Sequence, residues 1–105
     1  MITTLDAEEV AEASVVAALR KLHFSVVPKD AKKPGAAGIE AWKGTQRIFV
    51  QVTTTISPEE PRALTPDQKE SLRRQAAKAG SQPWEARVLL SPDLELVHLE
   101  WRPLE

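Results

Sequence analysis

Apolar residues recur along the chain with two different periods, and each period predicts a type of secondary structure. Between residues 6 and 22 they recur at spacings of three and four, which is typical of an amphipathic helix. Elsewhere, β-branched and aromatic residues form short stretches bounded by turn residues, and such stretches are typical of strands. The expected strands span 24–27, 39–43, 47–55, 84–90 and 94–101.

Both expected helices have start signals. Asp6 with Glu9 three residues later has the spacing of a capping box. In the second helix Thr65 is the expected cap, a proline takes the first helical position, and Gln68 completes the pattern. Gly80 is expected to end this helix. The order α-β-β-β-α-β-β predicts an α/β domain with a mixed sheet of about five strands flanked by two helices.

Composition narrows the class of protein. A chain of 105 residues has room for one hydrophobic core, so we expect a single domain over 1–105. The absence of Cys excludes disulfides, thiolate metal sites and a cysteine nucleophile, and His23 and His98 lie too far apart for a zinc-binding motif. No apolar run approaches the roughly 18 residues of a membrane span. We therefore expect a soluble cytoplasmic protein with no membrane partner.

Charge is unevenly distributed although the formal net charge is only −1. The segment 20–78 holds 12 of the 14 basic residues and 6 of the 15 acidic ones, whereas the two ends of the chain are acidic. Such segregation is compatible with one basic face, and equally with a scatter of solvated side chains.

Polar residues gather on one face of the expected hairpin. Side chains two apart in a strand share a face, so Glu40 shares one with Gly38 and Trp42, and Gln51 shares one with Thr53. A short turn at 44–46 would bring Glu40 near Gln51, and Glu12 lies at the rim of the apolar stripe of the first helix. We expect Glu12 to face Gln51. The alternative for Glu40, Gln51 and Thr53 is an ordinary solvated sheet face.

The elements and their motifs resemble archaeal-type Holliday junction resolvases of the PD-(D/E)XK nuclease superfamily. The resemblance spans about residues 8 to 101 and rests on element order, a basic loop, the LT-x-x-Q helix start and the paired final strands. It is carried by the runs EASVVAALRKLHFSVV, GIEAWKGTQRIFVQVTTT and LTPDQKESLRRQAAKAGSQPWEARVLLSPDLELVHLEW. It implies a restriction-endonuclease-like fold.

The resemblance also implies chemistry. The family holds Mg²⁺ with carboxylates at the end of a hairpin, beside a lysine. Its helix glutamate falls on Glu12, its hairpin aspartate on Gly38, and its E-x-K motif on the segment from Gln51 to Thr53. Glu40 lies two residues after Gly38 on the same strand face, so it offers a carboxylate displaced along the strand from the position of that aspartate. The candidate catalytic residues are therefore Glu12, Glu40, Gln51 and Thr53, with Glu12, Glu40 and Gln51 as candidate Mg²⁺ ligands.

The resemblance gives the basic residues a role in binding branched or duplex DNA. The candidate DNA-binding residues are Lys29, Lys32 and Lys33 in the loop, and Lys69, Arg73, Arg74 and Lys78 in the second helix. Because related resolvases act on a two-fold junction, we also expect a homodimer. Trp42, Trp84 and Trp101 remain open to core packing, a dimer interface or base stacking.

Two positions depart from the family pattern. Gly38 has no ligand to offer, and Thr53 removes a positive charge. We therefore expect a resolvase-like protein that binds DNA and whose cleavage is weak or lost. The alternatives are a Mg²⁺-dependent DNA endonuclease with its carboxylate displaced to Glu40, and a protein-interaction module that uses only the fold.

Overall fold

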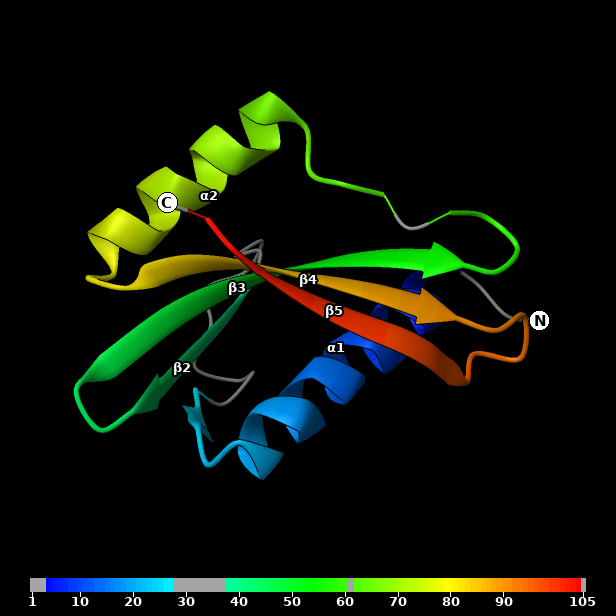
Figure 1. The fold of residues 1–105 in the computed structure, drawn as a ribbon, viewed down its shortest axis with the longest axis horizontal. Helices are drawn as coiled ribbons and strands as arrows, with labels where there is room; N and C mark the ends of the chain where they lie inside the picture. The colour runs from blue at the N-terminus through cyan, green and yellow to red at the C-terminus, as the bar shows by residue number, and fades with distance from the viewer. Residues whose placement is uncertain (1–3, 28–37, 61, 105) are drawn as a thin grey trace.

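The computed structural model describes residues 4–27, 38–60 and 62–104, in the expected order α-β-β-β-α-β-β (Figure 1). Its first half holds α1 (Thr4–Lys21), β1 (Ser25–Val26), β2 (Ile39–Lys43) and β3 (Gln46–Ile56). Its second half holds α2 (Pro66–Lys78), β4 (Gln82–Leu90) and β5 (Leu96–Pro103).

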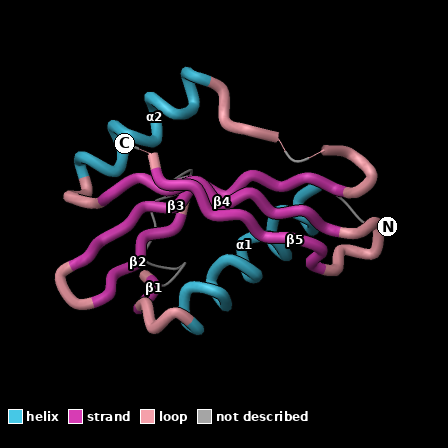
Figure 2. The backbone as a smooth tube through the Cα atoms, viewed as in Figure 1, coloured by secondary structure: helices cyan, strands magenta, loops and turns pink. Residues whose placement is uncertain are grey.

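The five strands form one mixed sheet in the order β1-β2-β3-β4-β5. Neighbouring strands are antiparallel except for β3 and β4, which are parallel. A parallel pair needs a crossover connection, and α2 lies in that connection. The two helices cover opposite faces of the sheet, α1 below it and α2 above it in the view of Figure 2. The fold class expected from the sequence is confirmed.

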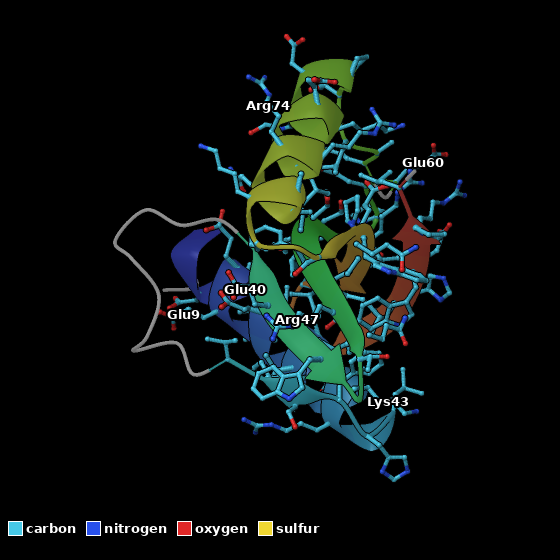
Figure 3. All side chains as sticks on the ribbon, turned by 90° about the vertical axis from the view of Figure 1, so that its left-hand side faces the viewer. Glu9, Glu40, Lys43, Arg47, Glu60 and Arg74 are labelled. Atoms are coloured by element: carbon cyan, nitrogen blue, oxygen red, sulfur yellow. The ribbon has the colours of Figure 1, made fainter. Side chains whose placement is uncertain are left out.

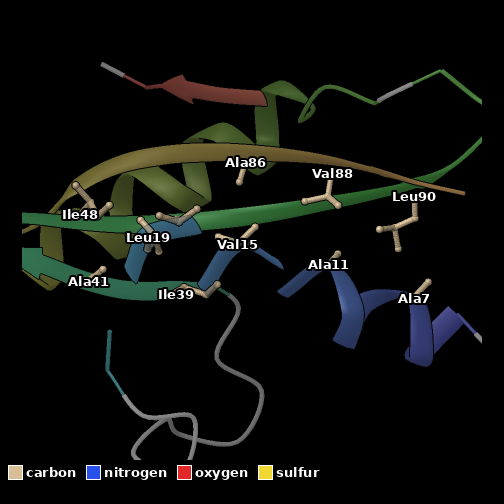
Figure 4. Close-up of a cluster of buried hydrophobic side chains, with 11 residues drawn as sticks. Ala7, Ala11, Val15, Leu19, Ile39, Ala41, Ile48, Ala86, Val88 and Leu90 are labelled. Carbon is tan, nitrogen blue, oxygen red and sulfur yellow. The ribbon is translucent and has the colours of Figure 1, made fainter. Parts of the chain in front are cut away.

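The larger core lies between α1 and the sheet (Figure 4). Residues four apart on α1 form its helical side, because a spacing of four returns to the same face of a helix. They are Ala7, Ala11, Val15 and Leu19. The facing strand residues are Ile39, Ala41, Ile48, Val50, Ala86, Val88 and Leu90. The small side chains at positions 7 and 11 allow α1 to approach the sheet closely.

A smaller core lies on the other face, under α2. It consists of Phe49, Leu64, Leu72, Ala76 and Leu104. Since Phe49 belongs to this core and Val50 to the larger one, alternate residues of β3 face α2 and α1. Gln51, Thr53 and Thr55 therefore lie on the α2 face.

The start of α2 is confirmed and the start of α1 is corrected. Thr65 caps α2 with its hydroxyl accepting from the Gln68 backbone N–H (3.2 Å), and the Gln68 side chain accepts from the Thr65 N–H (2.9 Å). Helix α1 already begins at Thr4, so Asp6 lies inside its first turn and does not cap it. At this position the Asp6 carboxylate still interacts favourably with the positive end of the helix dipole. Among the described residues, no helix is long and apolar enough to cross a membrane.

Candidate functional site

The β2–β3 hairpin brings Glu40 and Gln51 onto one face, as expected. In the hairpin register Ile39 pairs with Val50 and Glu40 with Phe49. Gln51 lies two residues beyond Phe49 on the same strand face, so it is the diagonal neighbour of Glu40. Glu40 is exposed, whereas Gln51 is half-buried.

Glu12 does not join these two residues, and the expectation that it faces Gln51 is wrong. Glu12 belongs to α1, which packs against Val50 and the other α1-facing residues. Gln51 points to the opposite face because side chains alternate along a strand. The physical reason is the apolar stripe of α1, which turns the helix toward the aliphatic side of β3. Glu12 lies half-buried at the flank of that stripe.

Position 38 has no room for a side chain. Gly38 has φ +102°, a backbone conformation that side-chain-bearing residues rarely adopt. A Cβ at this position would lie 2.6 Å from Phe49 Cε1 and 2.9 Å from the Val50 carbonyl oxygen. The position that the resemblance assigns to a metal-binding aspartate is therefore packed for glycine.

Beside Gln51 and Thr53 lies a buried ion pair that the sequence reasoning missed. The parallel register pairs Gln51 with Glu85 and Thr53 with Arg87. The side chain of Glu85 is 1% exposed and that of Arg87 is 15% exposed. Arg87 Nη2 donates to Glu85 Oε1 (3.1 Å), and the Leu64 backbone N–H donates to Glu85 Oε2 (2.9 Å). The sequence signal for this ion pair is the triplet Glu85-Ala86-Arg87 within a largely apolar strand. Residues two apart in a strand share a face, so its two charged side chains lie side by side.

The cross-strand neighbours of this ion pair on β5 are also charged, because Arg87 pairs with Glu100 and Glu85 pairs with Arg102. A hydrogen bond from Arg102 holds the pKa of the Glu100 carboxyl below its ordinary value. The charges of Arg102, Arg87 and His98 add to this effect, and desolvation opposes it. Thr53 Oγ1 and Arg87 Nε are buried and make no hydrogen bond to any described residue.

These residues do not fit the Mg²⁺ ion that the resemblance implies. A hard cation needs several oxygen ligands at one point. Gly38 supplies none, Glu12 belongs to the helix on the other face, and Glu40 has only the Gln51 amide as a neighbour on its face among the candidates. Within residues 4–27, 38–60 and 62–104, no three His, Asp or Glu side chains gather closely enough to hold a metal ion.

Four of the seven candidate DNA-binding residues lie together on α2. Leu72 and Ala76 face the sheet, so the cations lie on the flank and the outer side of the helix. They are Lys69, which is half-buried, and the exposed Arg73, Arg74 and Lys78. Arg74 also approaches Glu70, with 4.0 Å between Nε and Oε1. The remaining candidates, Lys29, Lys32 and Lys33, lie outside the described residues.

A pocket of about 210 Å³ opens between the hairpin and the end of α2. Its polar and aromatic lining comes from Glu40, Trp42, Arg47 and Ser81, with Val27, Ala41 and Ala79 completing it. Figure 3 shows Glu40 and Arg47 on the same side of the hairpin, below α2.

The three tryptophans have different environments. Trp84 and Trp101 pack against the larger core, as one interpretation of the sequence expected. Trp42 is 41% exposed, so core packing is wrong for this residue.

Comparisons with known proteins point to one fold. No family model matches the chain, and no curated protein matches it. Among solved structures, the crystal structure of Hjc from Archaeoglobus fulgidus, a Holliday junction resolvase from an archaeal hyperthermophile, superimposes with a TM-score of 0.62. The alignment covers 90% of this chain and 74% of that chain, at 23% sequence identity. The chain therefore has the restriction-endonuclease-like fold of an archaeal Holliday junction resolvase.

Proposed function

We propose that this protein binds branched or duplex DNA and that it cleaves DNA weakly or not at all. The fold supports the first half, together with the cations of α2. The second half rests on one observation above all, the Phe49 ring that fills the space a side chain at position 38 would need.

The cleavage half follows from two missing groups. A metal-binding carboxylate is absent at Gly38, and a cation is absent at Thr53. The nearest cation in register with Thr53 is Arg87, and one of its nitrogens is already bound to Glu85. Removal of one preorganised electrostatic group costs roughly 10² to 10³ in rate, so the loss of two leaves little activity.

The binding half follows from charge. Lys69, Arg73, Arg74 and Lys78 lie within about three turns of one helix. Cations spaced along a surface bind the phosphate backbone by releasing condensed counterions, largely independently of base sequence. Each phosphate contact contributes about −0.9 to the slope of log affinity against log salt concentration.

The experiment measures affinity for a four-way junction and for a duplex between 50 and 200 mM salt. We expect affinity to fall steeply with salt, and we expect Arg74→Gln/Lys78→Gln to weaken binding and make the slope shallower by about two. The matched control is Arg20→Gln/Lys21→Gln, which removes two exposed cations from the last turn of α1 on the other face of the sheet. Absence of binding at the lowest salt would overturn the proposal.

Cleavage is tested in the same samples with Mg²⁺ or Mn²⁺. We expect no more product than with the metal chelated. Robust metal-dependent cleavage that Glu40→Ala abolishes would instead establish the alternative, an endonuclease with a displaced carboxylate.

The second alternative is a protein-interaction module that uses only the fold. Leu22, Leu96 and Val97 are large apolar residues that are about half exposed. They do not form one patch, because Leu96 and Val97 are consecutive in β5 and point to opposite faces of the sheet, and Leu22 lies with Trp84 and Trp101 near the other end of β5. Single exposed apolar side chains are ordinary. This function becomes the better interpretation only if the protein binds neither DNA.

A further inference from the structure

We propose that the pocket between the β2–β3 hairpin and the end of α2, here called the hairpin pocket, binds an unstacked DNA base, with the Trp42 indole as its stacking surface. The inference rests on the proposed DNA-binding function and names the part of the DNA that this pocket recognises. At about 210 Å³ the pocket is smaller than the roughly 300–1,000 Å³ of sites for drug-sized ligands, which suits a single ring system.

Trp42 supplies a flat apolar surface that packing within the fold leaves partly exposed. It is 41% exposed, whereas Trp84 and Trp101 pack against the larger core. A base stacks on an aromatic side chain without regard to sequence, and loss of such a stack weakens binding by roughly 5- to 150-fold. Trp42 lies on the pocket side of β2, in the same row as Arg47 of β3.

Charges around the indole match the polar parts of a nucleotide. Arg47 lines the pocket and offers guanidinium donors to a phosphate oxygen. Glu40 lies two residues before Trp42 on the same strand face, and its exposed carboxylate accepts hydrogen bonds. Guanine presents two adjacent donors to one carboxylate, its ring N1–H and its amino group, whereas adenine, cytosine and thymine each present one donor on the same edge. The pocket therefore favours guanine over the other bases.

The position of the pocket connects it to the cations of α2. Ala79 and Ser81 close the pocket from the end of α2, and Lys78 directly precedes Ala79. A strand whose phosphates lie along α2 therefore passes the pocket opening. In a continuous duplex both faces of each base are covered by its neighbours, whereas strands that part at a branch point expose a base face. Trp42 thus gives a physical basis for preferring branched DNA.

The experiment compares the full chain with Trp42→Ala and Trp42→Phe, using a four-way junction and a duplex of equal length at one low salt concentration. We expect Trp42→Ala to weaken junction binding about tenfold and to leave duplex binding unchanged, while Trp42→Phe retains most of the affinity. Leu22→Ala is the matched control, because Leu22 is a similarly exposed apolar residue at the end of α1. We expect it to change neither affinity.

A second arm tests the role of Glu40. Junctions with guanine or with thymine at the branch point are compared, and we expect a preference for guanine that Glu40→Ala removes. If Trp42→Ala leaves junction binding unchanged, or weakens junction and duplex equally, the pocket does not hold a base and this inference fails. If the unaltered chain binds neither DNA at low salt, the proposed function itself fails, so the two failures are distinguishable.

Discussion

The Phe49 ring occupies the space into which a side chain at position 38 would extend, with Cε1 only 2.6 Å from where a Cβ would lie. We therefore expect Gly38→Ala to lower the free energy of unfolding by about 2 kcal/mol or more. The added methyl group would clash with the Phe49 ring, and the positive φ at position 38 is unfavourable for alanine. Urea denaturation measures this change.

Gly44 provides the control for Gly38. It also has a positive φ, +60°, but a Cβ there would meet nothing within 4 Å. We expect Gly44→Ala to cost less than Gly38→Ala, since only the backbone term remains. Equal losses would show that the Phe49 contact is unimportant.

The same packing predicts that Gly38→Asp/Thr53→Lys does not acquire Mg²⁺-dependent cleavage.

Loss of Glu85 is expected to be the most destabilising single charge removal. Glu85→Ala leaves Arg87 buried without its carboxylate and the Leu64 N–H without its acceptor. Breaking a buried pair in this way costs about 3–5 kcal/mol. Glu59→Ala removes an exposed partner of Arg62 and should cost less than about 1 kcal/mol. Similar denaturation midpoints for both variants would contradict this expectation.

The Glu100 carboxyl gives stability a specific pH dependence. Its pKa is lowered in the folded chain, so its contribution is complete above the ordinary glutamate pKa of 4.5 and is lost as pH falls through the folded value. Carbon-13 NMR of the carboxyl group should show the lowered pKa in the unaltered chain. In Arg102→Ala the pKa should rise toward 4.5, because the hydrogen bond is its largest cause. An unchanged Glu100 titration in that variant would refute the assignment.

The capping box sets the start of α2. Thr65→Ala removes the hydroxyl that accepts from the Gln68 N–H, and we expect a loss of about 1 kcal/mol in the free energy of unfolding. Ser71→Ala, an exposed change inside the same helix, should change stability by less than about 0.5 kcal/mol. If both changes cost the same, the cap contributes little.

We expect the protein to form a homodimer, because the branched DNA that we propose as its ligand presents paired strands related by a two-fold axis, and a short chain buries little core alone. Sedimentation velocity across micromolar concentrations measures the mass. A monomer at tens of micromolar would contradict the expectation.

The order of elements and the faces of the strands were predictable from the sequence, because they depend on neighbours along the chain. A period of two places Gln51 with Thr53 and Glu40 with Trp42 in any strand, and Thr65 with Gln68 starts a helix through local hydrogen bonds. The basic residues of α2 followed from the same local reasoning, since Leu72 and Ala76 define the buried side.

The tertiary structure decided which of these faces meet. Glu12 and Gln51 are separated by the sheet because the side on which α1 packs depends on many apolar contacts, which a single helix does not specify. The pairing of Thr53 with Arg87 depends on the register of two parallel strands joined through α2, and no short turn sets that register. The approach of Phe49 to Gly38 likewise exists only once β2 and β3 are paired and Phe49 joins the core under α2. Local physics thus determined the elements and their faces, whereas long-range packing determined the site.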